Sequence, residues 1–185
     1  MRHVYSAIIL FMLVIFGSLF IDAHPAVSAT AAEINRDARN ALQKLYVRSA
    51  SAKILGEKAK AILVFPGITK GGFMVGGQYG EGALIEGGKV VAHYSTVSIS
   101  YGLQIGIQRY GYALFFLTDS ALKYLNRSDG WELGTGPSIV VVNAGAAGGI
   151  STTTAQSDVY AFFFSQKGLM AGLGLHGTKI TKIQK

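Results

Sequence analysis

A glycine-rich stretch between residues 60 and 83 constrains the fold more than any other part of the chain. It opens with the continuous apolar run Ala61–Phe65, which is typical of a fully buried β-strand, and Pro66-Gly67 follows as a turn signal. Six glycines then lie between Gly71 and Gly82. Because glycine weakens a strand entropically, repeated glycines within strands indicate a bulge, a tight bend, or the close approach of another backbone or a ligand.

The composition describes one folded domain with a basic surface. The chain has 185 residues, of which 50% are hydrophobic and 15% are charged, which argues against disorder. It contains no cysteine, which excludes disulfides, thiolate metal sites and a cysteine nucleophile. The formal net charge of +7 favours anionic partners, namely phospholipid head groups, nucleic acid or acidic protein. The sign of the charge does not choose among these three.

The first segment has the pattern of a targeting signal. Arg2 and His3 precede the largely apolar stretch Val4–Ile21, and the small-residue run Ala26–Ala29 follows. This order predicts a secretory signal peptide over residues 1–29, cleaved after Ala29, and a single domain over residues 30–185. The alternative is a permanent membrane anchor, for which the apolar stretch is slightly short. An exported chain without disulfides is expected in the periplasm or envelope of a bacterium.

The residues after this segment predict an amphipathic helix. Thr30 and Glu33 have the spacing of a capping box, and Ser49-Ala50-Ser51 indicates a break or a second cap before a short helix over Lys53–Lys58. The apolar residues at helical spacing are Ile34, Ala38, Ala41, Leu42 and Leu45. Between residues 36 and 60 there are seven basic residues and two acids.

This basic helix has two interpretations. In the first, it binds lipid phosphate through its cations while its apolar face meets the membrane. In the second, its apolar stripe packs on a sheet and its basic face is merely solvated, which is the commoner arrangement. The two are compatible, because the alanine-rich stripe suits packing on a sheet better than insertion into acyl chains.

The remainder of the chain reads as glycine-rich strands. Glu86-Gly87-Gly88-Lys89 predicts a two-residue hairpin that joins antiparallel strands over Phe73–Ile85 and Val90–Ser100. Thr118 is a candidate cap for a short helix over Ala121–Asn126. Further strands are expected over residues 103–108, 112–117, 131–143, 159–164, 169–175 and 178–183, with a loop over 145–154. About eight strands with little helix predict an α+β fold, mainly antiparallel β, with a small barrel-like sheet, an N-terminal amphipathic helix and one short inserted helix.

No catalytic or metal-binding constellation is present in the sequence. His93 and His176 are the histidines beyond the first segment, and no cluster has ligand spacing. A Gly-x-Ser-x-Gly motif is absent, and the segment Gly82–Lys89 misses the spacing of a phosphate-binding loop. Glu81 is the one acid of interest, either in a buried ion pair with a lysine such as Lys70 or as a functional acid of a hydrolase. We therefore expect no enzyme, no cofactor, no metal and no nucleic-acid partner.

Several separated motifs resemble the SYLF domain family. They are AILVFP at residues 61–66, then a lysine and GGFMVGGQYGEGAL at 70–84, GLQIGIQ at 102–108, and GLMAG at 168–172. The resemblance implies binding of anionic phospholipid, such as a phosphoinositide or a bacterial acidic lipid, and actin binding in some eukaryotic relatives. It implies a lipid site on the basic helix and the lysine before the glycines: Arg36, Arg39, Lys44, Arg48, Lys53, Lys60 and Lys70. The alternative is a structural or protein-interaction module of the cell envelope.

Overall fold

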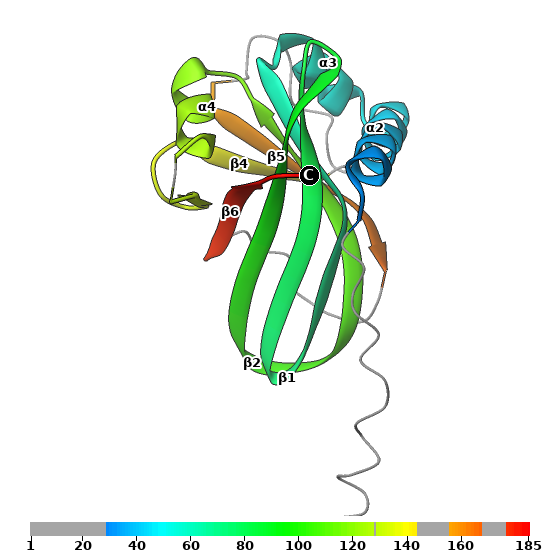
Figure 1. Ribbon diagram of the computed structural model, residues 1–185, viewed down its shortest axis with the longest axis vertical. Helices are drawn as coiled ribbons and strands as arrows, with labels where there is room; N and C mark the ends of the chain where they lie inside the picture. Colours follow the sequence, from blue (N-terminus) through cyan, green and yellow to red (C-terminus); the bar gives the residue numbers. More distant parts are fainter. Residues whose placement is uncertain (1–28, 128, 144–155, 168–176) are drawn as a thin grey trace, which may run out of the picture.

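The computed structural model describes residues 29–127, 129–143, 156–167 and 177–185 (Figure 1). The elements are α2 (Ala31–Arg48), α3 (Ala50–Lys58), β1 (Ala61–Glu86), β2 (Lys89–Phe116), α4 (Asp119–Leu125), β3 (Trp131–Glu132), β4 (Ile139–Asn143), β5 (Val159–Lys167) and β6 (Thr178–Ile183). The signal peptide expected over residues 1–29 lies, except for Ala29, outside the described residues. So do the loop expected over 145–154 and the strand expected over 169–175.

One long antiparallel hairpin organises the sheet. β1 and β2 pair from Ala61–Phe116 to Glu86–Lys89, and Gly87 and Gly88 form the turn with φ of 53° and 80°. The predicted hairpin is confirmed, since both turn positions need the positive φ that glycine accepts readily.

The two hairpin strands are longer than the sequence indicated. Pro66-Gly67 was expected to end the first strand, but β1 continues to Glu86 with register shifts between Phe65 and Ile68 and between Phe73 and Val75. Bulges of this kind bend a strand without ending it. The hairpin therefore curls over at its lower end in Figure 1 and forms a half-barrel.

The remaining strands extend this curled sheet on both sides. The order is β3-β6-β2-β5-β4, with β1 paired to β2. β4 runs parallel to β5, and the other pairs are antiparallel. The α+β class with a mainly antiparallel, barrel-like sheet is confirmed. The expected strand over 131–143 is divided, because only Trp131–Glu132 and Ile139–Asn143 are strand residues.

Two glycines allow the later half of β1 to pass close to its first half. A Cβ atom on Gly82 would collide with the carbonyl oxygen of Val64. A Cβ on Gly80 would lie 2.7 Å from the Cγ1 atom of Ile68 and 3.0 Å from the carbonyl oxygen of Gly67. The expectation that strand glycines permit the close approach of another backbone is confirmed at these two positions.

The alternation of side chains along the strands creates a core on each face of the sheet. Leu63, Tyr112 and Leu114 belong to the core on the concave face, which α4 also covers. Val64 and Phe115 belong to the core on the convex face, beneath α2 and α3. In Figure 1, α2 and α3 lie beside the upper part of the sheet and do not extend over its lower part.

The helix boundaries follow local capping signals. Thr30 caps α2 with the expected capping box, in which the Thr30 side chain accepts a hydrogen bond from the Glu33 backbone N–H and Glu33 accepts one from the Thr30 backbone. Ser49 ends α2 and caps α3 through its bond from the Ala52 N–H, as the sequence predicted. Thr118 caps α4 in the same way through Ala121.

Candidate functional site

The apolar stripe of α2 is buried against the sheet. Ile34, Ala38, Leu42 and Leu45 are all buried within the convex core. The helix therefore packs its apolar face on β1, as the second interpretation predicted, and only its charged faces meet solvent.

The seven basic residues predicted to bind lipid do not form one patch. Arg36, Arg39, Lys44, Arg48, Lys53 and Lys60 are exposed, and Lys70 is half-buried. Two have acidic partners: the Arg36 Nε lies 2.9 Å from the Asp37 Oδ1, and the Lys60 Nζ lies 3.3 Å from the Asp119 Oδ2. The hydrogen bond to Asp37, together with its charge, raises the pKa of Arg36. Within the described part of the chain, no carboxylate forms an ion pair with the other exposed cations, which are Arg39, Lys44, Arg48 and Lys53.

The cations of α2 fall on two faces of the helix. At 3.6 residues per turn, Arg36 and Arg39 lie about 60° apart on the face away from the sheet. Lys44 and Arg48 lie about 40° apart on a different flank. Lys44 lines a groove between α2 and β1. The arginines and lysines are thus exposed along the length of the helix rather than concentrated on one side.

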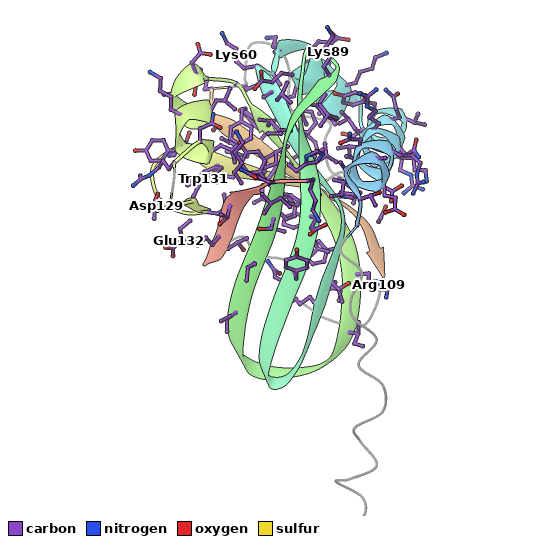
Figure 2. The ribbon with its side chains drawn as sticks, viewed as in Figure 1. Lys60, Lys89, Arg109, Asp129, Trp131 and Glu132 are labelled. Carbon is purple, nitrogen blue, oxygen red and sulfur yellow. The ribbon has the colours of Figure 1, made fainter. Side chains whose placement is uncertain are left out.

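Lys60 and Lys70 lie apart from this helix. Lys60 pairs with the first residue of α4, and Figure 2 shows it at the upper end of the molecule on the side of α4. Lys70 follows Thr69, which lines the groove beside α2, so strand alternation directs Lys70 toward the other face of the sheet. Its partner across the strands is Gln108, which is fully buried.

Glu81 forms the buried ion pair that the sequence suggested, but with a different lysine. Its Oε1 atom lies 3.0 Å from the Lys185 Nζ, and the two side chains are 11% and 12% exposed. The Tyr79 hydroxyl donates a 2.7 Å hydrogen bond to the same oxygen, and the Lys185 Nζ also donates to the Ala29 carbonyl oxygen at 3.0 Å. The proposed partner Lys70 was wrong, because it faces the opposite side of the sheet. Burial, followed by the bond to Glu81, raises the pKa of Tyr79 to about 12.

A groove opens beside this ion pair, between α2 and the convex face of β1. Its volume is about 750 Å³. The helix contributes Ile34, Asp37, Asn40, Ala41 and Lys44; the sheet contributes Pro66, Gly67, Thr69, Tyr79, Gly80 and Glu81; and Ala29 and Ser165 complete the lining. The sequence analysis identified Glu81 and Lys44 as separate candidates, but no local sequence pattern indicates that they line the same groove.

Other chemistry has little support in the described residues. No group of three or more His, Cys, Asp or Glu side chains lies close enough there to hold a metal ion. His93 bonds through its Nε2 to the Asn35 Oδ1 at 2.8 Å and so joins β2 to α2, while His176 lies outside the described residues. None of the helices in the described ranges is both long and apolar enough to cross a membrane.

The comparison with known proteins concerns the second half of the chain. A family model described as Ysc84, Las17-binding protein actin regulator, matches residues 97–185. This range contains most of β2 and all the later elements, but not α2. No individual curated protein matches the chain. Residues 97–185 therefore match the model of the Ysc84, or SYLF, domain family, in agreement with the resemblance drawn from the sequence motifs, of which GLQIGIQ and GLMAG lie within the matched range.

Proposed function

We propose that this protein is a non-enzymatic module that binds membranes containing anionic phospholipid through the exposed cations of α2 and α3. The observation that carries the proposal is the set of four exposed basic side chains, Arg39, Lys44, Arg48 and Lys53, that have no carboxylate partner among the described residues. The match of residues 97–185 to the Ysc84 family supports an interaction module in general, since that family suggests protein or membrane interactions.

The packing of α2 favours surface binding over insertion. Its apolar stripe already contributes to the convex core, so inserting that stripe into a bilayer would require the helix to leave the sheet. Each basic residue near an anionic membrane contributes about 1 kcal/mol, so one flank of α2 that presents two cations, such as Lys44 and Arg48, supplies about 2 kcal/mol. On the other face, Arg36 adds to Arg39, because an exposed ion pair such as Arg36–Asp37 is weak and is readily exchanged for lipid phosphate.

A structural role for Glu81 supports the non-enzymatic part of the proposal. Its carboxylate accepts a hydrogen bond from Tyr79 and is paired with Lys185, so these contacts join β1 to residue 185. We place the protein in the bacterial envelope after removal of residues 1–29, a location that rests on the signal-peptide pattern of the sequence.

Vesicle flotation with charge-neutralised variants tests the proposal. We expect the protein to float with vesicles that contain phosphatidylglycerol and not with vesicles of phosphatidylcholine alone. The double variant Lys44→Gln/Arg48→Gln, which neutralises both cations of one flank of α2, should bind about thirtyfold more weakly, since it lacks two contributions of about 1 kcal/mol each. The matched control Lys123→Gln/Arg127→Gln removes the same charge from α4 and the turn that follows it, on the opposite side of the molecule from α2 (Figure 1), and should bind like the wild type. Equal binding to both vesicle types, or an equal loss in the control, would refute the proposal.

A protein-interaction module is the second candidate, and β4 favours it. β4 is the last strand of the sheet among the described residues, and its Val140 and Val141 are 39% and 54% exposed. Exposed apolar side chains on an edge strand are suited to pairing with another chain. In that case the helix charges would be dispensable, and a pull-down from an envelope extract would return a protein that Val141→Lys no longer captures.

A further inference from the structure

We infer that the groove between α2 and β1 binds one phospholipid molecule, with its phosphate at Lys44 and an acyl chain along the convex face of the sheet. This inference rests on the proposed function and refines it. The proposed function needs only attraction between a charged surface and the membrane, whereas the inference adds a site that holds one lipid molecule per chain. A groove of about 750 Å³ falls within the range of small-molecule sites, which is about 300–1,000 Å³.

The walls of the groove suit a ligand that is largely apolar. Ile34 and Ala41 from the helix face Pro66 and two glycines from β1. The glycines present bare backbone, and a Cβ atom built on Gly67 would meet no other atom within 4 Å. The space beside the exposed Gly67 is therefore open and can be occupied by a side chain or a ligand.

The charges in the groove leave Lys44 as the cation available to an anionic head group. Both carboxylates that line the groove have cationic partners: Asp37 pairs with Arg36, and Glu81 pairs with Lys185. Within the described residues, Lys44 has no such partner. An ammonium group beside neutralised carboxylates attracts a phosphate without an opposing charge.

Hydrogen-bonding groups converge on the same space. Asn40, Thr69 and Ser165 line the groove and offer an amide and two hydroxyl groups. Ser165 has a φ of 54°, the one positive value among the non-glycine residues that the structure describes. Such strained conformations occur preferentially at ligand-binding sites, where the surrounding structure holds them.

An exposed apolar track continues from the groove down the sheet. Tyr79 lines the groove, is 52% exposed, and pairs across the strands with Val97, which is 43% exposed. Ile99 follows two residues later on the same face of β2 and is 63% exposed. These three side chains lie beyond the part of the convex face that the helices cover. An acyl chain lying along them would remove their apolar surface from water.

Titration with a soluble short-chain lipid tests this site separately from membrane attraction. The probe is dihexanoyl phosphatidylglycerol below its critical micelle concentration. Its binding to the full chain is measured by isothermal titration calorimetry. We expect one molecule to bind per chain. Dihexanoyl phosphatidylcholine should bind about tenfold more weakly, and glycerol 3-phosphate, which has no acyl chain, should show no measurable binding.

Two variants place the lipid in the groove. Gly67→Phe fills the open space on the sheet side of the groove and should weaken binding of the probe at least tenfold, while Gln43→Phe adds the same ring to the exposed face of α2 and should change it less than twofold. Ala41→Leu narrows the groove from the helix side and should act in the same direction as Gly67→Phe, which covers the case that one variant folds poorly. Lys44→Gln should weaken binding of phosphatidylglycerol but not of phosphatidylcholine.

The inference is overturned if the soluble probe does not bind, if the groove variants bind it like the wild type, or if glycerol 3-phosphate binds as tightly as the lipid. Its failure is distinguishable from that of the proposed function. If the protein floats with anionic vesicles but does not bind the soluble lipid, the proposed function holds and the groove site is refuted. If it neither floats with the vesicles nor binds the soluble lipid, both the proposed function and the groove site are refuted.

Discussion

Replacing Glu81 with glutamine removes one charge from the ion pair that joins β1 to the end of the chain. The Glu81 Oε1 and the Lys185 Nζ lie 3.0 Å apart, and both side chains are nearly buried, with exposures of 11% and 12%. Glutamine has the same shape and keeps an oxygen that can accept the hydrogen bond from Tyr79. The substitution therefore tests the charge of the pair rather than the packing around it.

The geometry sets the size of the effect. At 3.0 Å and an effective dielectric constant near 20, the attraction between two unit charges is about 5 kcal/mol. Desolvation of both groups offsets part of this, and removal of one partner from a buried pair costs about 3–5 kcal/mol. Because the pair retains slight exposure, we expect Glu81→Gln to lower the free energy of unfolding by about 3 kcal/mol. For a domain of this size that corresponds to a fall of about 6–12 °C in Tm.

A double-mutant cycle with Lys185→Met measures the interaction itself. We expect the double variant to be about 2 kcal/mol more stable than the sum of the single effects predicts, because neither charged member of the pair is then left without the other. A second readout is the pKa of Tyr79, which the Glu81 carboxylate helps to raise to about 12 and which should fall in Glu81→Gln, as followed by NMR titration. Additive single effects, or an unchanged pKa of Tyr79, would refute the role assigned to this pair.

Two further predictions concern stability. Gly82→Ala should lower the free energy of unfolding in chemical denaturation by about 1–3 kcal/mol, because the added Cβ collides with the carbonyl oxygen of Val64. Gly77→Ala is the control: its added Cβ would lie 3.9 Å from the nearest atom, so it should be neutral or slightly stabilising. Hydrogen bonds from the backbone and side chain of Ser138 hold the pKa of Asp158 below its usual value of 3.8, so this carboxylate contributes stability above that pH and loses it as the pH falls through the lowered value. Thermal unfolding of Asp158→Asn should accordingly show a smaller loss of Tm between neutral and acidic pH than the wild type, and identical slopes would contradict this assignment.

The features predicted correctly from the sequence are those that depend on neighbouring residues. The capping box of Thr30 and Glu33, the second cap at Ser49 and the Gly87-Gly88 turn each involve groups within four residues of one another. The last strand, Thr178–Ile183, was predicted with the bounds that it has in the structure. Its alternating buried and exposed residues follow from local pattern alone.

The features that the sequence did not reveal depend on pairing between distant segments. Pro66 reads as the end of a strand, but pairing with β2 carries β1 past it through a bulge. The parallel pairing of β4 with β5 has no local signal either.

The same reasoning applies to the site. Glu81 stood out as an acid among glycines, but its partner Lys185 is distant in the sequence and is brought to it by the course of the sheet. The basic residues of α2 were identified, but the packing of the helix decides which of them face the groove and which face away. Lys70 was misplaced because the register of β1, not its position in a motif, determines the face on which it lies.

The most direct measurement is the partition of the unmodified protein between buffer and vesicles of two compositions, phosphatidylcholine alone and phosphatidylcholine with phosphatidylglycerol, at low and high salt. The exposed cations of α2 and α3 predict binding only to the anionic vesicles, and salt should weaken that binding because exposed charges are screened. Equal partition onto both vesicle types, or binding that salt leaves unchanged, would contradict the account.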